Sequence, residues 1–332
     1  MVGLALPVLA FAQQAPATPV LQIQTVAHAV DSLDKTVPFY RDVIGLRVGG
    51  SDSLAAQPMA LNGDQSKLTG TQGAKFRAAV LSIPNAAFDI KLAEFTGITR
   101  KNFVPNLQDP GVVTLVLKIR DMDQMLAKLK AAKTTIVTAG GQPINPTGNP
   151  NSKMRGLVVR DPDGLFIQLI QPDPLPASAA NSADMVLGGS LNLSIEDSAR
   201  TLTFLQDATG FVVSRPTGQL GASAPAAMMI NLPEARWRVT HGSIAGTTLD
   251  FGLIEYADVP RAKAAPAAAD PGAPALIMVV RDIDAAVDQW KKAGGTVFST
   301  GGQAIKRADG ASEVLVRDIN GLMYELTSHG AQ

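Results

Sequence analysis

The sequence contains no cysteine, only three histidines, and an aromatic content of 5% across 332 residues. Without cysteine the chain forms no disulfide, and it has neither a thiolate nucleophile nor a zinc-thiolate site. Charge is also scarce, because only 17% of the residues are charged and the 29 basic residues balance the 29 acidic ones. A chain without a basic excess has little with which to neutralise phosphates, so we expect no nucleic-acid partner.

The amino terminus carries the one feature typical of export. Residues 1–12 (MVGLALPVLAFA) form an apolar run that ends in Ala10-Phe11-Ala12, the small-residue pattern of a cleavage site, although no positive residue precedes it. We predict that residues 1–19 are a signal peptide or leader and that the protein is periplasmic or secreted. The alternative is a disordered Ala/Pro-rich leader. No later run approaches the length of a membrane span, so we expect no membrane partner after cleavage.

The remaining chain is an internal duplication. Arg77 recurs as Arg238 and Arg120-Asp121 as Arg281-Asp282, both 161 residues later, and Arg160-Asp161 recurs as Arg317-Asp318 after 157 residues. Several segments that hold nearly one offset indicate two copies of one unit. The predicted domains are residues 20–172 and 185–330, joined by a Pro/Ala-rich linker at 173–184.

Each half of a copy repeats one order of elements. In the first half, a strand at 25–30 precedes a helix that ends at Gly45, and two further strands occupy 76–83 and 87–95. The order restarts with a β-rich run at 112–119. In the second copy, the Pro/Ala-rich stretch 259–274 separates the halves and is predicted to be a flexible surface excursion.

The order of elements and two segments resemble a known family. Residues 39–46 (FYRDVIGL) and 160–169 (RDPDGLFIQL) resemble the vicinal oxygen chelate superfamily, which includes glyoxalase I, extradiol dioxygenases and bleomycin-resistance proteins. The resemblance implies an α+β fold of paired βαβββ modules, which form two open, cupped mixed sheets with helices outside. It also implies that two modules enclose a cavity in which a divalent metal binds vicinal oxygens of the substrate.

The resemblance also implies where metal ligands, usually His, Glu or Gln, would stand. They would lie on the first strand of each module and on its last strand. In the first copy these positions hold Thr25, Lys91, Thr114 and Gln168, and in the second copy Ser190, Gly252, Ala275 and Glu325. Hydroxyls, a glycine, an alanine and a lysine are poor partners for a divalent ion. We therefore predict no cofactor and no metal of the family's usual kind, with a rearranged divalent site as the alternative.

Some of these side chains remain candidates for ligand binding. Lys91, Gln168 and Thr25, with Thr114 and Ser190, are polar groups able to line a pocket for an anionic or carbonyl-bearing molecule. Duplicated charges are different. Glu94 and Glu255 recur with Arg77 and Arg238, and we interpret these pairs as holding the fold.

The histidines offer one catalytic hypothesis. By strand alternation His28 lies opposite Thr25, toward the helix, and His329 lies near the carboxyl terminus in solvent. His241 aligns with Val80 and is predicted to enter the second cavity beside Glu325. A His241–Glu325 pair would suit general acid–base chemistry.

Three functions remain open from the sequence. The first is an exported protein that binds a small molecule without the family's metal, as a monomer or homodimer. The second is a lyase, isomerase or dioxygenase of the superfamily with a rearranged site, so whether the chain is an enzyme stays open. The third is a non-catalytic structural module.

Overall fold

The computed structural model describes residues 20–49, 57–245, 247, 249–263, 265–308 and 310–329. The predicted signal peptide or leader, residues 1–19, lies outside these ranges. Among the described residues, no helix combines the length and apolar character needed to cross a membrane.

The chain forms four modules that each open with a strand and a helix. The first contains β1 (Val20–Val30), α1 (Leu33–Pro38), the π-helix η1 (Phe39–Ile44), β2 (Arg47–Gly49), β3 (Met59–Ala60), α2 (Gly63–Thr69), β4 (Lys75–Ser82) and β5 (Asp89–Thr96). The second contains β6 (Val113–Ile119), α3 (Met122–Ala131), β7 (Thr135–Ile136), η2 (Ala139–Gly141), β8 (Arg155–Arg160) and β9 (Phe166–Gln171).

The linker contains the short helix η3 (Ala177–Asn181), and after it the same order of strands and helices repeats. The third module contains β10 (Val186–Ile195), α4 (Ser198–Thr209), β11 (Phe211–Val213), α5 (Ala224–Ile230), β12 (Arg236–Ile244) and β13 (Asp250–Ala257). The fourth contains β14 (Pro274–Val280), α6 (Ile283–Lys292), β15 (Thr296–Val297), β16 (Ile305–Lys306), β17 (Ser312–Arg317) and β18 (Met323–Ser328).

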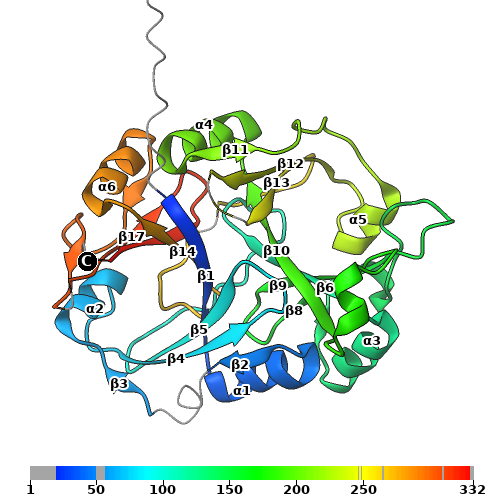
Figure 1. Ribbon diagram of the computed structural model, residues 1–332, viewed down its shortest axis with the longest axis horizontal. Coiled ribbons are helices and arrows are strands. Elements are labelled where there is room, and N and C mark those ends of the chain that lie inside the picture. The colour runs from blue at the N-terminus through cyan, green and yellow to red at the C-terminus, as the bar shows by residue number, and fades with distance from the viewer. Residues whose placement is uncertain are drawn as a thin grey trace, which may run out of the picture.

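These strands build two open mixed sheets, which confirms the predicted fold class (Figure 1). Sheet A has ten strands, in the order β15-β17-β18-β14-β1-β5-β4-β2, with β16 beside β17 and β3 beside β4. Sheet B has eight strands, in the order β11-β12-β13-β10-β6-β9-β8-β7. Within each module the first and last strands are parallel neighbours, and the first strands of two modules meet antiparallel at the centre.

The pairing of modules differs from the expectation that each copy forms its own sheet. Sheet A joins the first module to the fourth, because β1 pairs with β14. Sheet B joins the second to the third, because β10 pairs with β6. The sequence does not distinguish these arrangements, since duplicated modules offer nearly the same strand edges to one another. The boundaries of the two sequence copies stay a prediction.

The first helix of each module (α1 with η1, α3, α4 and α6) packs between the convex faces of the two sheets, where η1 contacts α3 and α4 contacts α6. One hydrophobic core therefore contains residues of all four modules. At its centre the fully buried Trp290 of α6 makes edge contacts with Phe204 of α4 and Tyr324 of β18, at ring-centroid distances of 5.2 and 4.9 Å. The concave faces are left free of these helices.

The duplicated charges hold this arrangement together, as predicted. Glu94 accepts hydrogen bonds from the Leu33 amide at the start of α1 and from Arg77, at 2.7 and 2.8 Å. Glu255 repeats the arrangement with the Ser198 amide of α4 at 2.7 Å and with Arg238. Each pair thus ties a strand hairpin to the first turn of a helix.

The second part of the Pro/Ala-rich stretch 259–274, residues 266–274, is mostly buried, so the prediction of a flexible surface excursion is wrong for this part. The Gly272 amide donates to the Ala29 carbonyl at 2.8 Å, and the Phe103 amide donates to the Pro271 carbonyl at 2.7 Å. Gly272 has φ +97°, and a Cβ there would lie 2.3 Å from the Phe103 oxygen, so only glycine fits. This part of the stretch packs against the end of β1, beside the concave face of sheet A.

Candidate functional site

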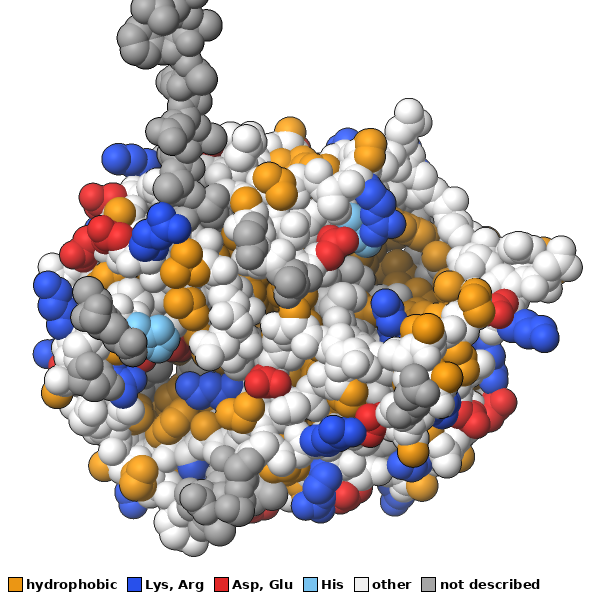
Figure 2. All heavy atoms as spheres, in the orientation of Figure 1, with side chains coloured by type: hydrophobic (Ala, Val, Ile, Leu, Met, Phe, Trp, Pro, Cys, Tyr) orange, Lys and Arg blue, Asp and Glu red, His pale blue; other side chains and the backbone are white. Residues whose placement is uncertain are grey.

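A cavity of about 130 Å³, which we call cavity A, opens on the concave face of sheet A. Figure 2 shows a hollow floored by hydrophobic side chains on this side of the molecule, at the left. The apolar lining consists of Leu61, Leu68, Phe76, Phe95, Leu315, Met323 and the alanines at 27, 29, 93, 268, 273 and 275. The polar lining consists of Gln65, Thr69, Lys91, Arg307, Glu313 and Glu325.

Helix α2 forms one wall of cavity A and is fixed to the opposite module. Its start is capped by Asn62, whose side chain accepts from the Gln65 amide at 2.8 Å. Near its end, the buried Ser299 hydroxyl donates to the Leu68 carbonyl at 3.0 Å, and the Thr300 amide donates to the Lys67 carbonyl at 2.9 Å. The first module thus closes over a cavity that the fourth module helps to build.

Lys91 and Gln168 occupy equivalent positions on the last strands of the first and second modules. Two observations confirm this: the hydrogen bond from each helix's first amide to that strand, and the strand register. Three residues after Lys91, Glu94 accepts from the first amide of α1. Three residues after Gln168, Gln171 accepts from the first amide of α3 at 2.8 Å. The strand register agrees. Thr25 pairs with Asp89 of the last strand, and the predicted residue Lys91 lies two residues further along that strand; the other three modules show the same offset. The counting from sequence was therefore consistent within each module.

The grouping of these positions into cavities was wrong, because sheets form across the copies. Sheet A brings together Thr25, Lys91, Ala275 and Glu325, and sheet B brings together Thr114, Gln168, Ser190 and Gly252. Lys91, Ala275 and Glu325 line cavity A. Thr25 lies on the same face of β1 as the lining residue Ala27, but it is not itself part of the lining.

Glu325 is one of the two carboxylates that line cavity A. Burial raises its pKa, and Glu313 adds to this, while the positive charges of Lys91 and Arg307 act in the opposite direction. Its neighbour Glu313 is already paired with Arg307 at 2.8 Å. The Lys91 ammonium lies 5.9 Å from the centre of the Phe76 ring, within range of a cation–π attraction.

Sheet B presents a different set of groups on its concave face, where Figure 2 shows a second hollow at the right. The Asn192 side chain donates to the Gln168 side chain at 3.4 Å, and its oxygen lies 2.5 Å from where a Cβ of Gly252 would stand. Part of this face is filled by α5, whose Met229 sulfur would lie 2.3 Å from a Cβ on Gly156. Thr114 pairs directly with Asn192 across the two central strands.

His241 belongs to this second face, so the predicted pair with Glu325 is not formed. His241 lies opposite Gly252 in sheet B, whereas Glu325 is a residue of sheet A. Burial lowers the pKa of His241, as does the charge of Arg215, and Asp250 acts against this. In the strand register, Gly252 is followed across the sheet by Asn192 and then Thr114.

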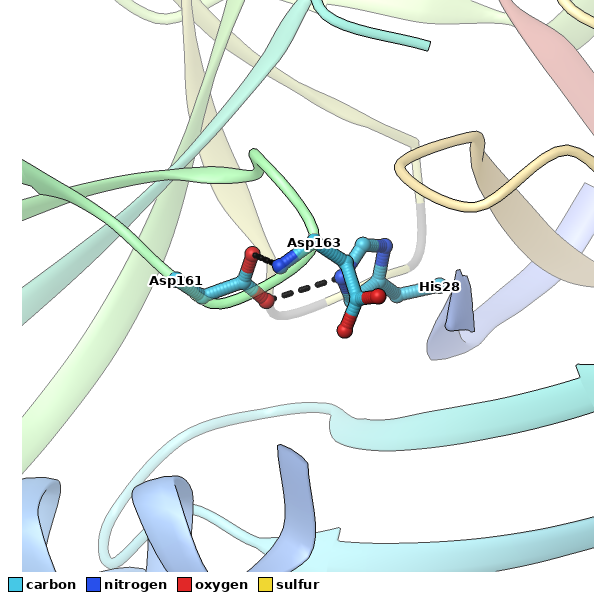
Figure 3. Close-up of side chains that lie close together, drawn as sticks. All are labelled: His28, Asp161 and Asp163. Carbon is cyan, nitrogen blue, oxygen red and sulfur yellow. Dashed lines mark hydrogen bonds and ion pairs between the residues drawn. The ribbon is translucent and has the colours of Figure 1, made fainter. Parts of the chain in front are cut away.

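One buried group of three possible metal-ligating side chains lies between the sheets. Atoms of His28, Asp161 and Asp163 lie within 4.8 Å of one another (Figure 3). His28 points away from cavity A, as strand alternation predicted, and its Nε2 lies 2.8 Å from Asp161 Oδ2. Burial acts to lower the pKa of His28, but the charge and hydrogen bond of Asp161, with Asp163 and the Ala273 carbonyl, raise it above its ordinary value.

The carboxylates of this group already have donors. Asp161 Oδ2 also accepts from the Tyr40 hydroxyl at 2.9 Å, and Oδ1 accepts from the Asp163 and Leu165 amides. Asp163 accepts from the Asp31 amide and the Thr36 hydroxyl. The carboxylate oxygens that would coordinate a cation therefore already accept hydrogen bonds from amide and hydroxyl groups. The group fits a buried ion pair that joins the two sheets better than it fits a metal site.

The family profile described as "Glyoxalase/Bleomycin resistance protein/Dioxygenase superfamily" matches residues 22–169. Residues 22–169 belong to this superfamily. Maize (Zea mays) glyoxalase I has a similar structure, with a TM-score of 0.60 at 14% identity over 92% of each chain. A putative dioxygenase from Bacillus subtilis has a TM-score of 0.55 at 14% identity, over 95% of this chain and 87% of that one. At this identity the likeness shows the fold alone. No curated protein sequence matches the chain.

The superfamily positions do not fit the divalent metal that its members often use. On sheet A they hold a threonine, an alanine, one carboxylate and the ammonium of Lys91, a cation where a cation would bind. In sheet B the same positions hold two hydroxyls, one amide and a glycine, without carboxylate or imidazole. The chain has the fold of these structural neighbours, and the groups at these positions do not suit a divalent ion.

Sequence reasoning missed the residues that come from outside the repeat register. Helix α2, with Gln65 and Leu68, was not predicted, although Asn62 and Gln65 form a readable capping box. Arg307 and Glu313 were missed because they follow a turn-rich segment without periodicity. Asn192 was missed because it lies two residues beyond the position carried over from the superfamily.

Proposed function

We propose that this protein binds a small organic molecule in cavity A without a metal ion. One observation carries the proposal: the superfamily's metal positions in this cavity hold Lys91 and a single carboxylate, in surroundings that are otherwise largely apolar. A concave, mostly apolar pocket with few polar groups is the usual form of a small-molecule site. The polar groups would orient the ligand directly, in place of a metal.

The test uses the neutral fluorescent probe N-phenyl-1-naphthylamine and the full chain. We expect saturable binding that EDTA leaves unchanged. Ala93→Phe, which fills the cavity, lowers the affinity at least tenfold by our estimate from lost apolar contact. Ala285→Phe adds the same ring on the exposed face of α6 and serves as the control.

The proposal fails if EDTA abolishes probe binding, or if Ala93→Phe behaves like Ala285→Phe. It also fails if metal analysis of the purified protein finds about one tightly held ion per chain. Native mass spectrometry of protein from its own host then identifies the natural ligand directly as a mass difference.

A second candidate is a metal-independent lyase or isomerase that uses the same cavity. The raised pKa of Glu325 favours it, because a carboxyl group that holds its proton more tightly suits proton transfer nearer neutral pH. Glu325→Gln would then retain probe binding and abolish proton exchange between a bound carbonyl compound and heavy water. If exchange in the wild type does not exceed that in Glu325→Gln, the cavity only binds.

Export is part of the proposal. Amino-terminal sequencing of protein from fractionated cells tests it, with a mature start near Gln13 in the periplasmic or secreted fraction as the expected result.

A further inference from the structure

Cavity A carries opposite charges at two positions that the internal repeat makes equivalent. Lys91 on β5 and Glu325 on β18 occupy the same place in the first and fourth modules. The two strands are separated by β1 and β14, which corresponds to roughly 14 Å along the sheet before it curves. The cupped sheet turns both side chains into the same cavity. The cavity thus carries a positive charge on β5 and a negative charge on β18.

Among the described residues, neither Lys91 nor Glu325 has a direct hydrogen-bond partner or an ion-pair partner within 4.0 Å. The Lys91 ammonium does lie 5.9 Å from the centre of the Phe76 ring, and its charge acts on Glu325 across the cavity. Arg307 and Glu313 at the same cavity show the contrast, because they pair with each other at 2.8 Å. A half-buried charge without a partner costs free energy unless something else supplies one.

The repeat separates charges that hold the fold from these two. Arg77–Glu94 recurs as Arg238–Glu255, so that pair is needed wherever the module occurs. The counterparts of Lys91 and Glu325 in sheet B are Gly252 and Gln168, which carry no charge. The scaffold therefore folds without charge at these positions.

We propose that cavity A selects a dipolar molecule, with an anionic group at Lys91, a cationic group at Glu325 and an apolar or aromatic body between them. The body would lie against Phe76, Leu68 and the alanines of the central strands. This inference rests on the proposed function, since it names the class of ligand that the same cavity takes. Such a molecule would supply an oppositely charged hydrogen-bonding group to both Lys91 and Glu325.

The experiment measures displacement of N-phenyl-1-naphthylamine by four compounds of one shape. They are 4-(aminomethyl)benzoate with both charges, 4-methylbenzoate with the anion, 4-methylbenzylamine with the cation, and neutral 4-methylbenzyl alcohol. We expect the doubly charged compound to bind at least tenfold more tightly than either singly charged one. Lys91→Met should remove the advantage of its carboxylate, and Glu325→Gln the advantage of its amine. The exposed changes Lys130→Met and Glu234→Gln serve as matched controls.

The outcomes separate the two proposals. If all four compounds displace the probe equally, the cavity binds small molecules but does not select a dipole, and only this inference fails. The same holds if Lys91→Met and Glu325→Gln behave like their controls. If the probe itself does not bind in cavity A, the proposed function fails first. If either singly charged compound binds most tightly, one of the two charges has been assigned wrongly to the ligand.

Discussion

Asp161 and Asp318 occupy the same position in the two copies, but their surroundings differ, and one difference is a strand residue that carries charge in only one copy. Beside Asp161 that residue is His28, and the equivalent position in the other copy is Leu193, since both pair with corresponding residues of the last strand. Burial acts to raise the pKa of Asp161, but His28 and Tyr40 bring it below its ordinary value. Asp318 has no such cation, and burial raises its pKa to about 6.

The His28 pair predicts a loss of stability at high pH. Because the pKa of His28 is raised in the folded state, its contribution is present below the ordinary histidine pKa of about 6.5 and is lost as the pH rises through the folded value. Urea unfolding should show a free energy of unfolding that falls above neutral pH. His28→Leu, which copies Leu193, should lower stability by about 3 kcal/mol at pH 6, as expected for breaking a buried pair.

The difference between wild type and His28→Leu should shrink as the pH rises from 6 to 9. A difference that is constant over this range would show that His28 is not charged in the folded protein.

Asp318 predicts the opposite trend at lower pH. A carboxyl group whose folded pKa is raised loses stability as the pH climbs from its unfolded value, about 3.9, to about 6, after which the loss is constant. Asp318→Asn keeps an acceptor for the Asn320 and Leu322 amides and does not ionise. We expect this variant to gain stability relative to wild type between pH 4 and 6. Asp161→Asn, measured alongside, should be less stable than wild type throughout this range, because the pKa of Asp161 is lowered and its contribution is lost only as the pH falls below the unfolded value.

At the scale of the strand, the register makes a constructive prediction about metal binding. Thr25→His, Lys91→Glu and Ala275→His together would place two imidazoles and two carboxylates, counting Glu325, on the concave face of sheet A. Nitrogen and oxygen ligands in such numbers bind Zn²⁺ or Co²⁺. The triple variant should bind one Co²⁺ with visible d–d absorption, and the wild type should show none.

A matched variant distinguishes the two ways of pairing modules. Thr25→His, Lys91→Glu and Thr114→His places the same residue types within one copy, and the structure puts them on different sheets. It should not bind Co²⁺ in this manner. Tight binding by this variant and not by the first would show that each copy forms its own sheet.

Much of this element-scale structure was predictable. Asp121 and Asp282 precede their helices as side-chain caps, and Gly45 ends the first helix with φ +95°, so the order of strand and helix follows local chemistry. The position of Lys91 followed from the same spacing. That Glu325 lines the same cavity did not follow, because the two residues are brought together only through pairing between β1 and β14. Duplicated strand edges carry no information about which copy they meet.

At the scale of the whole molecule, the structure predicts that the two copies cannot part. Each sheet takes half of its strands from each copy, and the helices between the sheets share one core. A protease site inserted between Pro174 and Leu175, where Leu175 is exposed, would cut the only covalent link. The nicked protein should elute from size exclusion at the position of the intact chain.

The two fragments should separate only in denaturant, and neither alone should unfold cooperatively as a monomer. Elution of two folded fragments from the nicked protein under native conditions would contradict the pairing described for both sheets.

The exchange of modules between copies also bears on how such a chain diversifies. If each copy were a separate chain and two identical chains paired in this way, both cavities would be identical. Every substitution would then appear in both cavities. Joined in one chain, a change in the first or fourth module reaches cavity A alone, and a change in the second or third reaches the concave face of sheet B alone. Lys91 and Glu325 on one side, and Gly252 and Gln168 on the other, record such a separation. Fusion of the copies has left the protein with two concave faces that are free to acquire unrelated specificities.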